Sequence, residues 1–147
     1  MKLAVVFDGS DDGLAGLRIA ADMLRANGQG HEICVAVIGW PPRRSPIWER
    51  AFTKREILDD LHRAMAEVAS QELQRLRELF SPLGSVKTEY MEGDPIAEVV
   101  ALVDRMKPDM LLVGLTRGKD AASVDAVAFE ITKRTSVPVF LTYGKPV

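Results

Sequence analysis

Short apolar runs alternate with longer amphipathic segments along almost the whole chain. Residues 3–7, 33–38, 110–113 and 137–143 are rich in Val, Ile and Leu, which is typical of strands buried on both faces. Residues 86–91 alternate apolar with polar side chains, a pattern that favours an edge strand. The pattern therefore predicts five strands.

Between these runs, apolar residues recur every three or four positions, as on one face of a helix. We expect helices over residues 12–27, from Thr53 to Phe80, from Asp94-Pro95 onward, and within 121–135. The apolar stripe of the second of these helices is predicted to consist of Ile57, Leu61, Met65, Val68, Leu73, Leu76 and Phe80. Strands and helices that alternate in this way predict an α/β fold with a parallel sheet sandwiched by helices. With no linker or repeat, residues 1–147 are interpreted as one domain.

The composition excludes several classes of partner. The net charge is -2 at pH 7, so no basic surplus points to nucleic acid. The apolar runs are too short to cross a membrane, and the first of them is too short for a signal peptide. Cys34 is the only cysteine, which fits a reducing compartment. We therefore expect a cytoplasmic protein with no membrane or nucleic-acid partner.

Two glycine-containing loops follow strands that are expected at the centre of the sheet. In such sheets, ligands bind beyond the carboxyl ends of the strands, where the strand order reverses. The first loop runs from Asp8 to Gly13 and the second from Gly114 to Lys119. Backbone N–H groups exposed at glycines can hold a phosphate, and Arg117 can add a charge-assisted hydrogen bond.

Each loop also has a purely structural interpretation. Asp8 can hold the turn through neighbouring N–H groups, and Ser10 or Asp11 can cap the helix that follows. The acids Asp8, Asp11 and Asp12 would repel a phosphate unless a cation such as Mg²⁺ lay between them.

Several of these segments, in this order, resemble the universal stress protein family. They are Asp8-Gly9-Ser10, Gly93-Asp94-Pro95, the run from Pro108 to Gly114, Thr116-Arg117-Gly118, and the closing run from Val137 to Leu141. Each segment is a weak signal alone, but the ordered set spans nearly the whole chain.

The resemblance implies a flavodoxin-like or adenine nucleotide alpha hydrolase-like fold with the strand order 3-2-1-4-5. It implies a stress-response binding or regulatory protein, not an enzyme, with ATP or another nucleotide as ligand and Mg²⁺ accompanying it. It also implies a homodimer through the last strand, and the apolar segment Val139–Tyr143 would form an edge suited to such pairing.

The implied nucleotide site lies between the first and fourth strands. Asp8 and the main chain near Val37 or Ile38 would hold the adenosine, and the glycine loops would hold the phosphates. The candidate binding residues are Asp8, Gly9, Ser10, Val37, Ile38, Gly114, Thr116, Arg117 and Gly118. No catalytic residue or metal ligand is assigned.

The chain departs from the family's nucleotide signature, which is Gly, two residues, Gly, nine residues, and Gly followed by Ser or Thr. Three residues separate Gly114 from Gly118, and the nine-residue spacing ends at Ala128-Phe129. This departure favours weak ATP binding or none. It leads to the hypothesis that Gly and Ser substituted at these two positions should raise ATP affinity.

Two other functions are left open. A phosphoacceptor signalling domain needs acids, a Thr and a Lys at set places, which Asp8, Asp11, Asp94, Thr116 and Lys145 nearly supply. Against it, the strand before Asp94 has an edge pattern. A hydrolase lacks the usual residues, although slow ATP hydrolysis is left open.

One further loop is unusual in composition. From Trp40 to Phe52 it mixes aromatic residues, arginines and prolines. This composition is interpreted as aromatic side chains packed on the second helix, with docking of a protein partner as the alternative.

Overall fold

A computed structural model describes residues 1–8, 11–39, 55–92, 94–114 and 121–142. The chain forms one parallel sheet with the strand order β3-β2-β1-β4-β5. This confirms the predicted fold class and strand order. The strands are β1 (Lys2–Phe7), β2 (His31–Gly39), β3 (Gly84–Glu92), β4 (Met110–Gly114) and β5 (Val139–Thr142).

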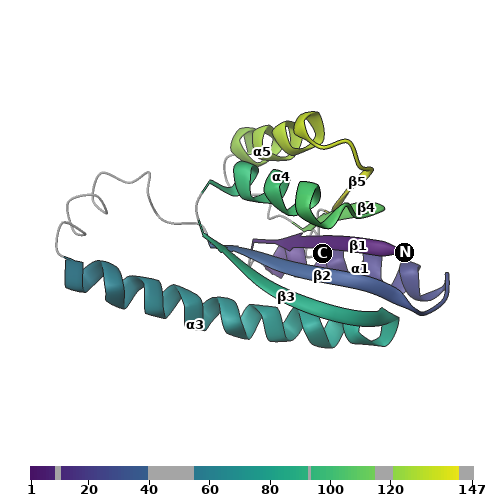
Figure 1. The fold of residues 1–147 in the computed structure, drawn as a ribbon, viewed down its shortest axis with the longest axis horizontal. Helices are drawn as coiled ribbons and strands as arrows, with labels where there is room; N and C mark the ends of the chain where they lie inside the picture. Colours follow the sequence, from purple (N-terminus) through teal and green to yellow (C-terminus); the bar gives the residue numbers. More distant parts are fainter. Residues whose placement is uncertain (9–10, 40–54, 93, 115–120, 143–147) are drawn as a thin grey trace.

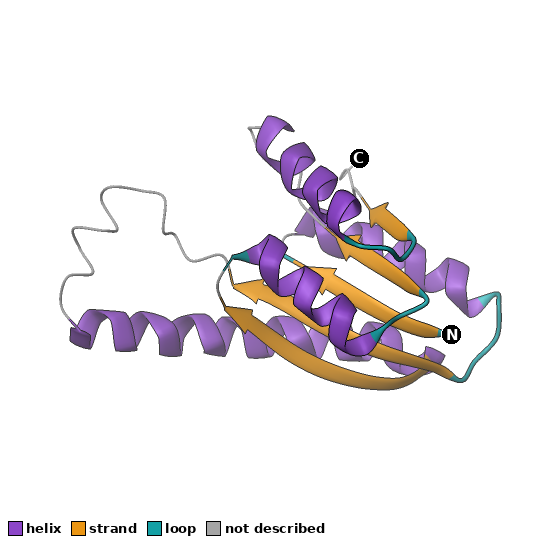
Figure 2. Cartoon of the chain, turned by 45° about the horizontal axis from the view of Figure 1, so that its top comes forward, coloured by secondary structure: helices purple, strands orange, loops and turns teal. Residues whose placement is uncertain are grey.

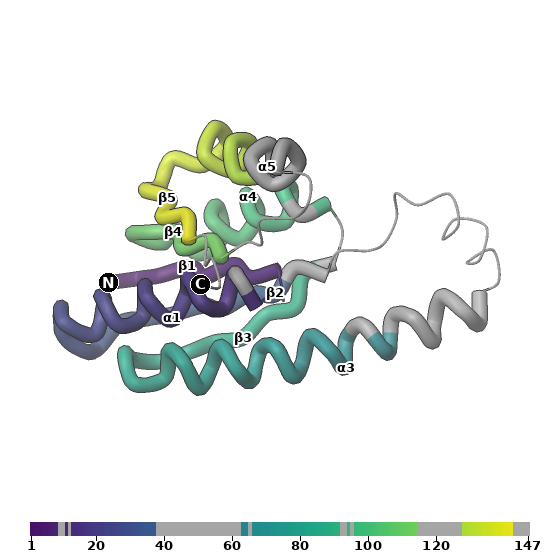
Figure 3. The backbone as a smooth tube through the Cα atoms, turned by 180° about the vertical axis from the view of Figure 1, so that it is seen from behind, coloured from purple at the N-terminus to yellow at the C-terminus, as the bar shows by residue number. Residues whose placement is uncertain are grey.

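Two of the described helices cover each face of the sheet. On one face lie α1 (Asp11–Arg25) and α3 (Arg55–Phe80), which continues into a short 3-10 turn (Ser81–Leu83). On the other face lie α4 (Pro95–Met106) and α5 (Ala121–Arg134). Figures 1 and 2 show these two layers on either side of the sheet, and Figure 3 shows α1 and α3 from behind. The amino-terminal part of α3 extends beyond the carboxyl edge of the sheet (Figure 2).

Alternate strand residues divide the core into two clusters, because successive side chains point to opposite faces. Leu3, Val5 and Phe7 pack with α1 and α3, whereas Ala4 and Val6 pack with α4 and α5. All five side chains are fully buried. The continuous apolar run of β1 is therefore explained by burial on both faces, as the sequence predicts.

Among the described side chains of α3, Ala69 is buried in place of the predicted Val68. The residues of α3 that are buried in or packed against the core cluster are Ala69, Leu73, Leu76, Leu79 and Phe80. Val68, which the sequence places on the apolar stripe, is instead 59 % exposed. Position 68 precedes Ala69 by one residue, about 100° around the helix, so only one of the two can face the sheet.

Helix boundaries follow local signals, with one exception. Gly28, just after α1, has φ of 105°, the left-handed conformation expected of a residue that ends a helix. Asp94 is the residue before α4 and Pro95 its first residue, as predicted. The Asp94 side chain, however, forms no capping hydrogen bond. Proline alone thus marks this helix start, since its φ is already helical.

The sheet has β3 and β5 as its outer strands. The edge position of β3 confirms the expectation from its alternating sequence. Phe140 on β5 is 41 % exposed and is therefore accessible to a second copy of the chain. The homodimer through β5 stays a prediction, which analytical ultracentrifugation can test. Among the described helices, none has the length and apolar character needed to span a bilayer.

Candidate functional site

The carboxyl edge of the central strands brings together four of the residues predicted to bind a ligand. In the sheet, Phe7 is the register partner of both Val37 on β2 and Gly114 on β4. Asp8, which follows Phe7, donates its backbone N–H to the carbonyl oxygen of Gly114 across 3.4 Å. Asp8, Val37, Ile38 and Gly114 therefore lie at one edge, where the strand order reverses. The predicted residues Gly9, Ser10, Thr116, Arg117 and Gly118 lie outside the described residues.

Strand β2 continues past the end of β1 at this edge. The last β1–β2 register pair is Phe7 with Val37, yet β2 runs on to Gly39 and remains paired there with β3. The main chain at Ile38 and Gly39 is therefore beyond the described β1–β2 ladder. Backbone N–H and C=O groups need partners, so this stretch suits main-chain recognition of a ligand.

Gly114 has a structural role as well as its place at the edge. A Cβ atom at this position would lie 2.7 Å from Leu17 Cγ and 2.9 Å from the carbonyl oxygen of Gly13, both on α1. Real Cβ atoms do not approach other atoms so closely. Gly114 therefore allows α1 to pack closely against β4, and this packing alone requires a glycine.

A second close contact, which the sequence analysis did not identify, lies beside the first. A Cβ atom at Gly16 of α1 would lie 2.5 Å from Thr142 Cβ on β5. Thr142 is buried and donates its hydroxyl to the carbonyl oxygen of Val113 across 3.2 Å. The two α1 glycines, Gly13 and Gly16, were the available sequence signal. They let the start of α1 sit directly on the ends of β4 and β5.

The acidic residues near this edge do not form a metal site in the part of the chain that the structure describes. No group of three or more His, Cys, Asp or Glu side chains gathers there. Asp11 instead lies 4.0 Å from Arg75 of α3, with its carboxylate exposed.

The sequence profile of the universal stress protein family matches residues 1–142. The chain belongs to the universal stress protein family. No curated protein sequence matches it significantly.

Solved structures agree with the family's fold. Universal stress protein UspA from Lactobacillus plantarum superposes with a TM-score of 0.69 at 16 % identity, over 97 % of each chain. A family member from Arabidopsis thaliana, solved with AMP bound, gives 0.66 at 18 % identity, over 96 % of this chain and 90 % of that one. The Archaeoglobus fulgidus universal stress protein, solved with dAMP, gives 0.55 at 16 % identity, over 97 % and 98 %.

Ala128 and Phe129 lie inside α5, well after its first residue, Ala121. These are the positions at which the nine-residue spacing of the universal stress protein signature ends. Ala128 is buried in the core on the α4 and α5 face. Phe129 is 59 % exposed, and Lys133 Nζ lies 4.5 Å from the centre of its ring. Ala128→Gly would place glycine in a helix interior, which costs about 1 kcal/mol. The geometry therefore gives no support to the hypothesis that Gly and Ser here would raise ATP affinity.

The structure also bears on the phosphoacceptor alternative for this universal stress protein. Asp94 follows β3, and β3 is an outer strand of the sheet. Asp8 follows the central strand β1, so β2 lies between the two strands that would supply the acids. Asp94 is therefore displaced from the edge where β1 and β4 end.

Proposed function

We propose that this chain is a stress-response regulatory protein that binds an adenine nucleotide at the carboxyl edge between β1 and β4, without acting as an enzyme. The main support for this proposal is that Phe7 pairs with Val37 on one side and with Gly114 on the other. Asp8, the next residue, therefore lies where the strand order reverses. Family members solved with AMP and with dAMP support an adenine nucleotide as the ligand class.

The residues at this edge offer complementary groups for a nucleoside. Asp8 is partly exposed and can accept hydrogen bonds from ribose hydroxyls through its carboxylate. The main chain of β2 at Ile38 and Gly39 continues past β1 and can bond the base. The side chain of Val37 is buried in the core, so its contribution would come from the backbone.

The proposal predicts a specific loss of affinity on changing Asp8. Titration calorimetry with AMP should give micromolar binding to the unaltered protein, and ATP, measured in the presence and absence of Mg²⁺, should bind more weakly because the chain departs from the family's nucleotide signature. Asp8→Asn should weaken AMP binding by roughly ten-fold, the lower range for a hydrogen bond to a charged group. Asp104→Asn, on the exposed side of α4, removes the same charge away from the edge and should leave affinity unchanged.

No heat at millimolar nucleotide would overturn the proposal. Equal losses in the Asp8 and Asp104 variants would also contradict it, because they would indicate a general effect of surface charge.

A further inference from the structure

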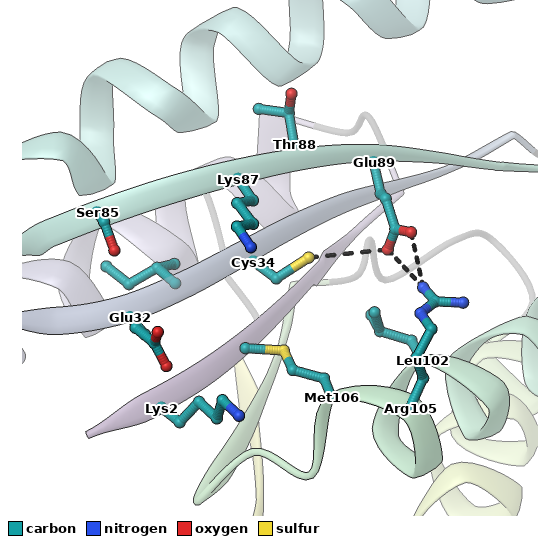
Figure 4. Close-up of a pocket in the computed structure, with 11 residues that line it drawn as sticks. Lys2, Glu32, Cys34, Ser85, Lys87, Thr88, Glu89, Leu102, Arg105 and Met106 are labelled. Carbon is teal, nitrogen blue, oxygen red and sulfur yellow. Dashed lines mark hydrogen bonds and ion pairs between the residues drawn. The ribbon is translucent and has the colours of Figure 1, made fainter.

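A hollow of about 390 Å³ lies on the α4 face of the sheet, away from the edge proposed to bind nucleotide. It is bounded by β1, β2, β3 and the last turns of α4, and Figure 4 shows it in close-up. Its lining begins at Lys2, Glu32 and Ser85, which are register neighbours near the starts of the three strands. The hollow is therefore nearer the amino ends of the strands, whereas Asp8 lies at their carboxyl ends.

Small side chains create the hollow. Across the sheet, Cys34 on β2 has Ala4 on β1 and Lys87 on β3 as register partners. Ala4 and Cys34 are buried and fill little of the space below α4. Leu102 and Met106 of α4 form the apolar wall. The volume is at the lower end of the range for small-molecule sites.

Two of the charges in the hollow neutralise each other. Arg105 Nη2 lies 2.7 Å from both carboxylate oxygens of Glu89, as Figure 4 shows. The Cys34 thiol donates to Glu89 Oε2 across 3.8 Å. Burial, and then the Glu89 charge, raise the pKa of Cys34 to about 11, so the thiol is neutral at physiological pH. This thiol is therefore a polar part of the floor, not a nucleophile.

The remaining charges have no partner of their own among the described residues. The side chains of Lys2, Lys87 and Glu32 form no ion pair or hydrogen bond there. In Figure 4, the ammonium group of Lys87 points over Cys34, and Glu32 extends between the two lysines. Lys87 and Glu32 are exposed, and together with the Arg105–Glu89 pair the lining carries three cations and two anions, a net charge of +1 that favours an anion over a cation. One monovalent anion would balance it.

We propose that this hollow is a second ligand site, which binds a small organic monoanion with its charged head near Lys87 and Lys2 and a short apolar body against Leu102 and Met106. A cation would add to the positive excess, and a zwitterion would leave it unchanged. An electrophile that reacts with thiols is disfavoured because Cys34 is neutral. A ligand as small as butyrate should bind with a Kd on the order of 1 mM.

The test is a titration of the full chain with butyrate, followed by backbone amide NMR shifts. The amides of Cys34 and Lys87 should shift and saturate together. Lys87→Gln should weaken binding and Glu32→Gln should strengthen it, each by roughly three- to ten-fold for one charge near a protein surface. Lys133→Gln on α5 makes the same charge change at a distance and should have no effect.

Butylammonium, which has the same apolar body and the opposite charge, is the second probe. Its affinity should rise in Lys87→Gln and fall in Glu32→Gln, the reverse of the changes expected for butyrate. The proposal is overturned if butyrate shifts no amide of the hollow at tens of millimolar. It is equally overturned if Lys133→Gln weakens butyrate binding as much as Lys87→Gln does.

Discussion

At β1 and β2, the two faces of the sheet carry side chains of different size. On the α1 and α3 face, Leu3, Phe7, Leu17 and Phe80 are completely buried. On the α4 and α5 face, the middle of β1 and β2 carries Ala4, Cys34 and Ala36, and the side toward β3 is charged.

The difference separates two tasks within one sheet. Large apolar side chains on one face supply burial and therefore stability, since each fully buried one contributes about 1.5 to 3 kcal/mol. Small and charged side chains on the other face leave space and unpaired charge near α4. Stability and ligand chemistry can thus change independently.

The largest effect should come from truncating the large-residue face. Phe80→Ala removes a fully buried ring and should lower the free energy of unfolding by about 3 to 5 kcal/mol. Cys34→Ala, beside the hollow, removes one sulfur atom and should cost on the order of 1 kcal/mol. Urea denaturation measures both. Similar losses in the two variants would mean that the faces do not differ as described.

A smaller loss is expected where α1 meets β4. Gly114→Ala would bring a methyl group against Leu17 and the Gly13 carbonyl, and overpacking of this kind costs about 1 to 3 kcal/mol. Urea denaturation again measures it, with Gly30→Ala as the control for adding a methyl group in open space at a strained φ. Unchanged stability in Gly114→Ala would show that this glycine is not required by packing.

The third effect is a change of stability with pH that depends on Cys34. Its pKa is raised from 9.0 to about 11 in the folded chain. Between these values the unfolded chain loses the thiol proton and the folded chain retains it, so stability should fall as pH rises. The contribution should be about 1 to 2 kcal/mol by pH 11. The difference in unfolding free energy between wild type and Cys34→Ala, measured from pH 8 to 11, isolates it. A difference that stays constant over this range contradicts the burial described for the thiol.

Much of this architecture could be predicted from the sequence, for identifiable reasons. Runs such as Leu3–Phe7 indicate strands buried on both faces, and Asp94-Pro95 sets the start of α4 by backbone geometry alone. The strand order came from the family resemblance. Val68 was placed on the wrong side of α3 because Ala69 adjoins it and periodicity alone does not choose between two neighbouring apolar residues.

The candidate sites were less accessible to sequence reasoning. The meeting of Asp8, Ile38 and Gly114 depends on strand register, which the family order implies only coarsely. The signature spacing led to Ala128 and Phe129, because a count of residues does not locate the start of α5. The hollow depends on three strands that place Lys2, Glu32 and Lys87 on one face, and no local motif encodes that placement.

The most direct test of the proposed function is an NMR titration with AMP that reports on both regions at once. The account predicts that the amides of Asp8, Ile38 and Gly114 at the carboxyl edge shift and saturate, while those of Cys34 and Lys87 in the hollow stay in place. Shifts confined to Cys34 and Lys87, or no shift anywhere at millimolar AMP, would contradict the assignment of the nucleotide to the edge between β1 and β4.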